Sequence, residues 1–255
     1  MTLLDALLIV LAGLAAGTIN TVVGSGTLIT FPTLVVLGVP PVVANVSNTI
    51  GLVAGGLTGV AGYRREISGS VRELLRLVPM SFLGGLTGAL LLLVLPADAF
   101  SAIVPVLIIL GITLVVFGPR LSAMAATHRA ADSGGWHQWA LAIGIFLAGV
   151  YGGYFGAAQG VILMGILSIL TTEHLQRLNG WKNVLGTVAN GVAALVFVIA
   201  APDQVNWAVA GLIAVGALIG GVVGSTIGRR LSPSVLRAVI VVMGTAALVK
   251  FLAFP

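Results

Sequence analysis

The chain has 255 residues, of which 58% are hydrophobic and only 7% are charged, and its mean hydropathy is +1.16. A soluble domain carries about 25% charged residues, so this composition cannot cover a water-exposed surface. Apolar runs of about 20 residues, long enough to cross a bilayer core, recur along the whole chain. We therefore predict an all-α integral membrane protein with no part left over for a soluble domain.

The distribution of charge and the absence of cysteine exclude several partners and kinds of site. The formal net charge is +5, but the basic residues lie between the apolar runs, as the positive-inside rule expects, and we predict no nucleic-acid partner. The chain has no cysteine, which excludes disulfides, thiolate metal sites and a cysteine nucleophile. Asp5 is the only charged residue before the first apolar run is under way, so we expect no cleavable signal peptide and a first membrane element from Leu3 onward.

The apolar segments form two sets of five. In chain order they lie at 3–24, 26–38, 43–63, 72–95 and 101–118, and then at 137–159, 160–171, 181–201, 205–228 and 233–253. An ungapped shift of 136 residues places seven glycines on glycines, among them Gly24 on Gly160 and Gly84 on Gly220. We interpret this as a degenerate duplication. The predicted organisation is a first repeat at 1–118, a cytoplasmic linker at 119–136 and a second repeat at 137–255, which together form one transport domain.

The positions of Lys and Arg decide between two arrangements of the halves. If each half crosses the membrane five times, the halves have opposite orientations, and the basic residues divide eleven to one between the two sides. If the short second segment of each half does not cross, the halves run parallel and the division is seven to five. We therefore predict an inverted repeat with both termini outside and Lys250 as the one basic residue on that side. The eleven on the cytoplasmic side are Arg64, Arg65, Arg72, Arg76, Arg120, Arg129, Arg177, Lys182, Arg229, Arg230 and Arg237.

The second segment of each half is too short for a full crossing. Segments 26–38 and 160–171 correspond to roughly 18–20 Å of helix, yet each has to return the chain to the side where its half began. The glycine-containing turns before them are therefore expected to lie partway through the membrane, one entering from each face. We predict eight long helices plus short re-entrant or broken ones. Broken segments at matching positions of two repeats indicate a transporter's substrate site.

Polar residues gather at these two turns. The first turn contains Thr21 and the candidate substrate-binding residues Asn20, Gly24, Ser25, Gly26 and Thr27, and the second contains Gln159 and Gly160. Glycines free backbone N–H groups, and a helix that begins just after a turn directs the positive end of its dipole at it, so this composition suits an anion. The alternative is that Gly and Ser only allow helices to pack closely.

The third segment of each half adds a second set of candidates, which are Asn45, Asn48, Lys182, Asn183 and Asn190. Lys182 is the basic residue that reaches furthest into an apolar segment near the proposed site, and its alternative role is that of a snorkelling lysine at the membrane interface. An amide such as Asn190 is costly in hydrocarbon without a partner, and helix–helix hydrogen bonding is its alternative role. Glycines at four-residue spacing, such as Gly84 and Gly88 or Gly220, Gly224 and Gly228, are expected to pack helices, and Trp136, Trp139, Trp181 and Trp207 to form an aromatic belt.

The chain lacks the residues of an intramembrane enzyme. Its carboxylates fall at or near the ends of segments, so no buried acid is expected as a proton relay or as a partner for a cationic substrate. They are Asp5, Glu66, Glu73, Asp98, Asp132, Glu173 and Asp203. His128, His137 and His174 have no metal-ligand spacing, and there is no Gly-x-Ser-x-Gly nucleophile turn. We predict no catalytic residues, no metal site and no cofactor.

Two stretches resemble the sulfite exporter TauE/SafE family. The first runs from Ala12 through Gly24-Ser25-Gly26-Thr27 and Phe31-Pro32 to Pro41, and the second from Gly149 through Gln159-Gly160 to Leu178-Asn179-Gly180-Trp181-Lys182-Asn183. The Asn-Gly-Trp-Lys-Asn stretch is the most specific part, and the likeness covers nearly the whole chain. Where this chain has Gly24-Ser25-Gly26, family proteins more usually have a Gly-Gly-Gly-type turn.

The resemblance implies secondary transport of a small sulfur-containing anion, such as sulfite or a sulfonate, across a bacterial inner membrane. Composition alone indicates an anion site but not sulfur. A passive anion channel, a transporter of a non-sulfur organic anion, and a membrane enzyme or scaffold are the alternatives. H⁺ and Na⁺ are both candidate coupling ions, and a homodimer is left open beside a monomer.

Overall fold

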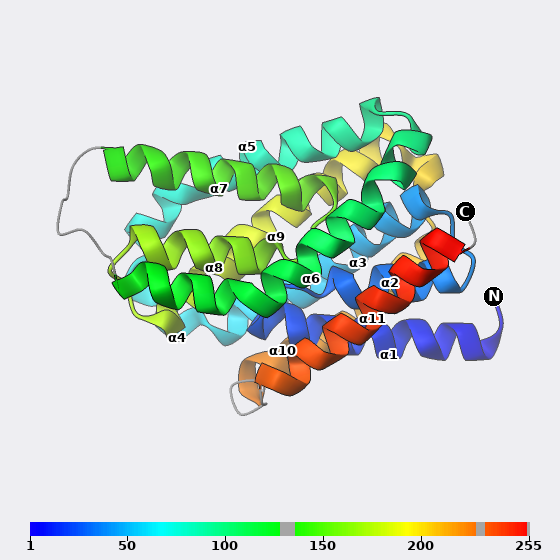
Figure 1. Cartoon of the computed structure of the whole chain (residues 1–255), viewed down its shortest axis with the longest axis horizontal. Helices are drawn as coiled ribbons and strands as arrows, with labels where there is room; N and C mark the ends of the chain where they lie inside the picture. The colour runs from blue at the N-terminus through cyan, green and yellow to red at the C-terminus, as the bar shows by residue number, and fades with distance from the viewer. Residues whose placement is uncertain (128–135, 228–232, 254–255) are drawn as a thin grey trace.

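The computed structural model describes residues 1–127, 136–227 and 233–253, and all of its regular elements in these ranges are helices (Figure 1). In chain order they are α1 (Leu3–Val22), α2 (Thr27–Val36), α3 (Pro41–Gly62), α4 (Arg64–Ser68), α5 (Val71–Val94), α6 (Ala97–Thr127), α7 (Trp136–Tyr154), α8 (Gln159–Leu170), α9 (Leu175–Ala200), a 3₁₀ turn (Pro202–Gln204), α10 (Trp207–Thr226) and α11 (Pro233–Ala253). Within the described ranges, six helices are long and apolar enough to cross a membrane.

The two short segments expected from the sequence are present. Helix α2 has 10 residues and α8 has 12, and each follows a break after a long helix. Helix α2 ends at Val36 and is followed by Gly38, which has a φ of +86° and no atom within 4 Å of a Cβ built on it, while the Val39 N–H reaches back to the Leu34 carbonyl at 3.0 Å. This glycine-terminated end satisfies carbonyls that the last helical turn leaves without partners.

Several boundaries differ from the sequence-based prediction. Helix α6 continues to Thr127 instead of ending at 118, and α9 begins at Leu175 instead of 181. The predicted linker at 119–136 therefore begins as helix, while residues 128–135 lie outside the described ranges. Lys182 therefore lies about two turns into α9, whereas the predicted segment 181–201 places it at the second residue. Polar residues end the apolar run in each case, but they do not end the helix, because backbone hydrogen bonds continue through them.

The assignment of Trp181 to an aromatic belt was wrong. Its side chain is only 3% exposed, and its indole N–H donates to the Ser70 hydroxyl at 2.8 Å. Trp136, Trp139 and Trp207 are exposed, as a belt residue would be. The difference arises because the start of α9 packs against α4, so a residue near a helix end is still covered by protein.

Glycines bring the long helices into backbone contact, as their four-residue spacing predicted. Gly13 packs on Ile213 and Gly17 on Ala217, so α1 and α10 run in the same direction. Gly84 and Gly88 make the equivalent contact between α5 and α7. Without side chains at these positions the helix axes approach closely, which drives association in lipid. Gly228 lies outside the described residues.

Helices α3 and α9 run in opposite directions. Gly56 contacts Thr187, and further along α3 Tyr63 contacts Gly180, so the residue numbers rise along one helix and fall along the other. The packing partners of the two halves also correspond, because α1 lies on α10 as α7 lies on α5, and α2 lies on α11 as α8 lies on α6. Helix α1 begins and α11 ends at the same end of the bundle (Figure 1).

The single shift of 136 residues matches only some of the helix boundaries in the two halves. Helices α5 and α10 begin at residues 71 and 207, which are 136 apart, but α1 and α7 end at residues 22 and 154, which are 132 apart. The glycine matched to Gly24 by helix endings is therefore Gly156, one helical turn before Gly160. An ungapped comparison misses this because one turn of helix preserves the side of the helix on which a glycine lies.

Candidate functional site

The two helix breaks cross each other in the interior at Gly24 and Gly160. A Cβ built on either glycine would overlap the Cα of the other, and the Gly160 N–H donates to the Gly24 carbonyl at 3.0 Å. Backbone from the first half therefore touches backbone from the second half with no side chain between them. The structure brings together the two turns that the sequence singled out, and their contact leaves no room for a methyl group.

The long helix before each break ends in the same way. The Gly24 N–H reaches back to the Ile19 carbonyl at 3.0 Å, and the Gly156 N–H reaches back to the Tyr151 carbonyl at 3.0 Å. Both glycines have positive φ, +91° and +77°, a conformation that disfavours any side chain. Ala158, just before α8, adopts φ +66° and is fully buried, which is unusual for a residue with a Cβ.

Lys182 lies directly against this crossing. Its side chain is 2% exposed, its Cδ lies 3.1 Å from a Cβ built on Gly160, and its ammonium donates to the carbonyls of Asn20 at 3.2 Å and Thr21 at 2.9 Å. These carbonyls belong to the last turn of α1, where four C=O groups lack helical partners and the dipole is negative. The ammonium is thus held inside the protein.

The end of each broken helix is capped by a side chain from the other half. The Asn183 amide donates to the Thr21 carbonyl at 3.2 Å, beside the Lys182 ammonium. The Asn45 amide, from α3, donates to the carbonyl of Tyr154 at the end of α7 at 2.9 Å. Residues of α3 and α9 therefore complete hydrogen bonds that the breaks leave open, which explains why amides occur at this depth.

Helix α2 is tied to α3 through Asn48. Its amide donates to the Thr27 hydroxyl at 3.2 Å, and its carbonyl oxygen accepts from the Thr30 hydroxyl. Thr30 was not among the predicted residues. The sequence could have indicated Thr30, because Thr27 was already a candidate and residues three apart on a helix lie on the same face.

Several predicted side chains carry buried polar atoms with no protein partner among the described residues. These atoms are the Ser25 hydroxyl, the Asn45 amide oxygen and the Gln159 amide nitrogen. Gln159 is 3% exposed and lies against Gly152, where an added Cβ would overlap its amide. An unmade hydrogen bond at a buried group costs about 1–3 kcal/mol, so three of them around one crossing indicate places for a polar guest or water.

The remaining candidates lie at the edge of the same cluster. The Gly26 N–H approaches the Asn20 amide oxygen at 3.5 Å, and the Asn190 amide oxygen lies 3.7 Å from a Cβ built on Gly156. All the predicted substrate-binding residues thus lie around the two breaks. The carbonyl of Tyr154 was missed, because no sequence pattern shows which backbone carbonyl a distant amide will reach.

Lys182 dominates the electrostatics of this region. Among the described residues it is the one charged side chain classed as buried, and its contacts are neutral carbonyls. An ammonium without a carboxylate partner in a low-dielectric interior favours the approach of a negative charge. The arrangement therefore places one positive charge without a carboxylate partner beside the contact of Gly24 and Gly160.

Comparison with known proteins places the chain among membrane transporters. The family model for sulfite exporter TauE/SafE matches residues 9–251. The chain is similar to probable membrane transporter protein ORF9 of Sinorhizobium sp, at 26% identity over 251 residues that cover 96% of this chain and 91% of that protein. It is also similar to probable membrane transporter protein YfcA of Escherichia coli strain K12, at 28% identity over 245 residues that cover 93% and 86% of the two chains.

A probable membrane transporter protein of Haemophilus influenzae is 25% identical over 231 residues, which cover 91% of this chain and 88% of that protein. No solved structure matches the chain. The family match extends over both helix breaks and over the Lys182 region, and so includes the residues that form the crossing. This multi-pass membrane protein therefore belongs to the sulfite exporter TauE/SafE family.

Proposed function

We propose that this protein is a secondary transporter that moves a small sulfur-containing anion, such as sulfite or a sulfonate, across the plasma membrane. The observation that carries the proposal is the buried Lys182 ammonium beside the crossing of Gly24 and Gly160. Broken helices that meet between two halves of a membrane protein are typical of transporter substrate sites. The sulfur part of the proposal comes from the description of the family.

The substrate site lies between two inverted repeats in this proposal. The opposite directions of α3 and α9, and the exchange of packing partners between the halves, support such an arrangement. The common end for the start of α1 and the end of α11 fits both termini on the outer side (Figure 1). With that orientation the arginines of α4 and those at the starts of α5 and α9 face the cytoplasm. They are Arg64, Arg65, Arg72, Arg76 and Arg177.

Transport requires the crossing to open and close. In the closed state the Lys182 ammonium and the Asn183 amide are held by the carbonyls of α1. We propose that an anion replaces these carbonyls as the acceptor when the turns separate, and that the unpartnered Gln159 amide then donates to it. Because the anion neutralises a buried charge, its binding offsets part of the desolvation cost of both groups.

The coupling ion in this scheme is H⁺ or Na⁺. None of the carboxylates in the described ranges is classed as buried, so a proton would travel on the substrate itself instead of on an acidic side chain. Na⁺ would be held by backbone carbonyls at the breaks, where irregular backbone exposes oxygen atoms.

Uptake into proteoliposomes tests the proposal. We expect saturable uptake of labelled sulfite or a small sulfonate that depends on an imposed proton or sodium gradient. Flux that rises linearly with concentration would indicate a passive channel, and saturable uptake of carboxylates in preference to sulfur anions would indicate a non-sulfur organic anion transporter. Absence of flux for every anion tested would exclude transport of this class.

A thermal-shift screen in detergent tests the ligand class independently of transport. A ligand that binds only the folded state raises the unfolding temperature in proportion to the logarithm of its concentration. We expect sulfur oxyanions to stabilise the protein, and cations at equal ionic strength to leave its unfolding temperature unchanged. Stabilisation by cations alone would contradict an anion site. The same purified sample gives the oligomeric state by native mass spectrometry, which decides between a monomer and the homodimer.

A further inference from the structure

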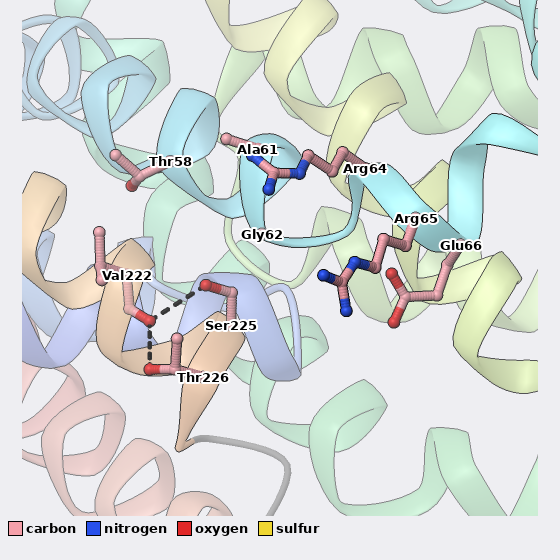
Figure 2. Close-up of a pocket in the computed structure, with 9 residues that line it drawn as sticks. All are labelled: Thr58, Ala61, Gly62, Arg64, Arg65, Glu66, Val222, Ser225 and Thr226. Atoms are coloured by element: carbon pink, nitrogen blue, oxygen red, sulfur yellow. Dashed lines mark hydrogen bonds between the residues drawn. The ribbon is translucent and has the colours of Figure 1, made fainter.

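A pocket lies where α3, α4 and the end of α10 meet (Figure 2), and its lining does not include the residues of the crossing. Its volume is about 520 Å³, and its lining includes both guanidinium groups of α4, those of Arg64 and Arg65. Pockets of about 300–1,000 Å³ are typical of small-ligand sites. The volume is therefore sufficient for a small oxyanion or a phosphate group.

The local fold holds the two arginines on the pocket side of α4. Tyr63 is 1% exposed and its hydroxyl accepts from the Asn179 amide at 2.6 Å, while Ile67 packs on Gly180 at the start of α9. Tyr63 and Ile67 are four residues apart and so lie on one side of this helical stretch. The three residues between them, Arg64, Arg65 and Glu66, are left to line the pocket, as Figure 2 shows.

The donors and charges of the lining favour an anion. The hydroxyls of Thr58, Ser225 and Thr226 donate to helix carbonyls, at 3.0 Å to Gly55, 3.0 Å to Val222 and 2.7 Å to Val222 respectively. The hydroxyl protons are thus already used, and guanidinium N–H groups are the strongest donors of the lining. Two arginines and Glu66 sum to one positive charge. Guanidinium groups bind planar or tetrahedral oxyanions through paired hydrogen bonds.

The pocket lies close to the end of α1. Gly59, one residue from the lining residue Thr58, contacts the Thr21 hydroxyl, and Gly224, next to Ser225, contacts the Thr21 Cβ. The Thr21 carbonyl in turn accepts from Lys182. Gly59 or Gly224, followed by Thr21, thus lies between the pocket wall and the ammonium at the crossing.

We propose that this pocket is a second anion site, which binds an oxyanion group through Arg64 and Arg65. A free sulfate-like solute and the head group of an anionic phospholipid both carry such a group. Binding at this site does not depend on transport, whereas its role as a vestibule that supplies anions to the crossing rests on the proposed function.

The absence of cysteine from the chain permits a local test. Thr226→Cys places a single thiol at the pocket, and its rate of modification by a neutral maleimide reports whether the pocket is occupied. In lipid-depleted micelles we expect sulfate to slow the reaction in a saturable way. In nanodiscs, a slower reaction with phosphatidylglycerol than with phosphatidylcholine identifies a lipid head group as the source of the anion.

Arginine variants in the same background decide whether the pocket is responsible. Arg64→Gln/Arg65→Gln should raise the concentration of sulfate or anionic lipid needed for half-protection by about tenfold or more, because charge-assisted hydrogen bonds are lost. Arg72→Gln/Arg76→Gln, in the exposed start of α5, is the matched control and should change it less than about twofold. Elution as a single species in size-exclusion chromatography checks that each variant is folded.

Protection by neither sulfate nor anionic lipid would overturn the proposal, as would an equal effect of the two double variants. The result is separable from that of the transport assay, because protection is an equilibrium property of the pocket. Lys182→Ala combined with Thr226→Cys should keep full protection even if it carries no flux.

Discussion

The two helix breaks share a backbone geometry but differ in charge. Both long helices end at a glycine of positive φ, and both ends are capped by an amide of the opposite half, from Asn183 or Asn45. The α1 end also receives the ammonium of Lys182, whereas the α7 end receives only the neutral amide. The comparison teaches that similar backbone geometry in the two breaks forms the crossing, while a single side chain, that of Lys182, gives it a positive charge.

The largest expected effect comes from breaking the shared geometry itself. Gly24→Ala combines a positive φ with backbone overlap at Gly160, and should lower the free energy of unfolding by about 3 kcal/mol and abolish uptake. Gly160→Ala retains only the overlap and should cost about 2 kcal/mol. Gly38→Ala retains only the positive φ, because nothing lies near its Cβ, and should cost about 1 kcal/mol.

Unfolding in detergent followed by circular dichroism, together with proteoliposome uptake, measures this series. Gly191→Ala is the matched control, since no atom lies within 4 Å of a Cβ built there and its φ is not positive. We expect it to leave uptake unchanged and to leave stability unchanged or up to about 1 kcal/mol higher, because Ala favours a helix more than Gly does. Equal stability of Gly160→Ala and Gly191→Ala would mean that the two breaks are not in contact in the detergent-solubilised protein.

The next prediction concerns a substitution that removes the difference in charge between the two breaks. Lys182→Ala should reduce anion uptake at least about 100-fold, because the buried positive charge at the crossing is lost. Its stability should change little, because the lost hydrogen bonds are offset by removal of an unpaired buried charge. Uptake is compared with that of Arg72→Ala, an exposed arginine of α5. Wild-type uptake by the Lys182 variant would reduce this residue to a structural cap of α1.

A smaller effect compares the two capping amides. Asn45→Ala leaves the Tyr154 carbonyl without its side-chain donor and should cost about 1.5 kcal/mol of stability. Asn183→Ala should cost about 0.5 kcal/mol, because Lys182 still donates to the Thr21 carbonyl. Chemical denaturation of both variants in one detergent gives the difference, and the reverse order of the two costs would contradict the proposed capping roles.

The last prediction concerns the Gln159 amide of the second break, whose nitrogen has no protein partner among the described residues. Gln159→Leu removes a buried nitrogen that makes no hydrogen bond to protein, so stability should stay within about 1 kcal/mol of the wild type. Uptake should still fall about tenfold if this amide donates to the substrate. Ser25→Ala is the corresponding change in the first break. A Gln159 variant with full uptake would place the substrate elsewhere along the crossing.

Composition and segment length were enough to predict a helical membrane protein with two short helices after glycine-containing turns. These properties depend on solvent and on local backbone preferences, because lipid demands internal hydrogen bonds and a segment of 10–12 helical residues cannot span a bilayer. The clustering of polar residues such as Asn20, Gln159 and Lys182 near the turns was likewise readable, because buried polar groups are costly and so mark unusual backbone.

Only the tertiary structure decided which groups meet. Trp181 and Lys182 are neighbours near the start of the same helix, and sequence position alone did not show that both are buried by α1, α4 and α8. The one-turn difference between the 132 and 136 shifts, the Asn45 bond to Tyr154 and the pocket at Arg64 and Arg65 also arise from contacts between distant segments. Local sequence determined where helices break and which residues are polar there. Long-range packing determined the partner of each polar atom, because such contacts depend on the relative placement of whole helices.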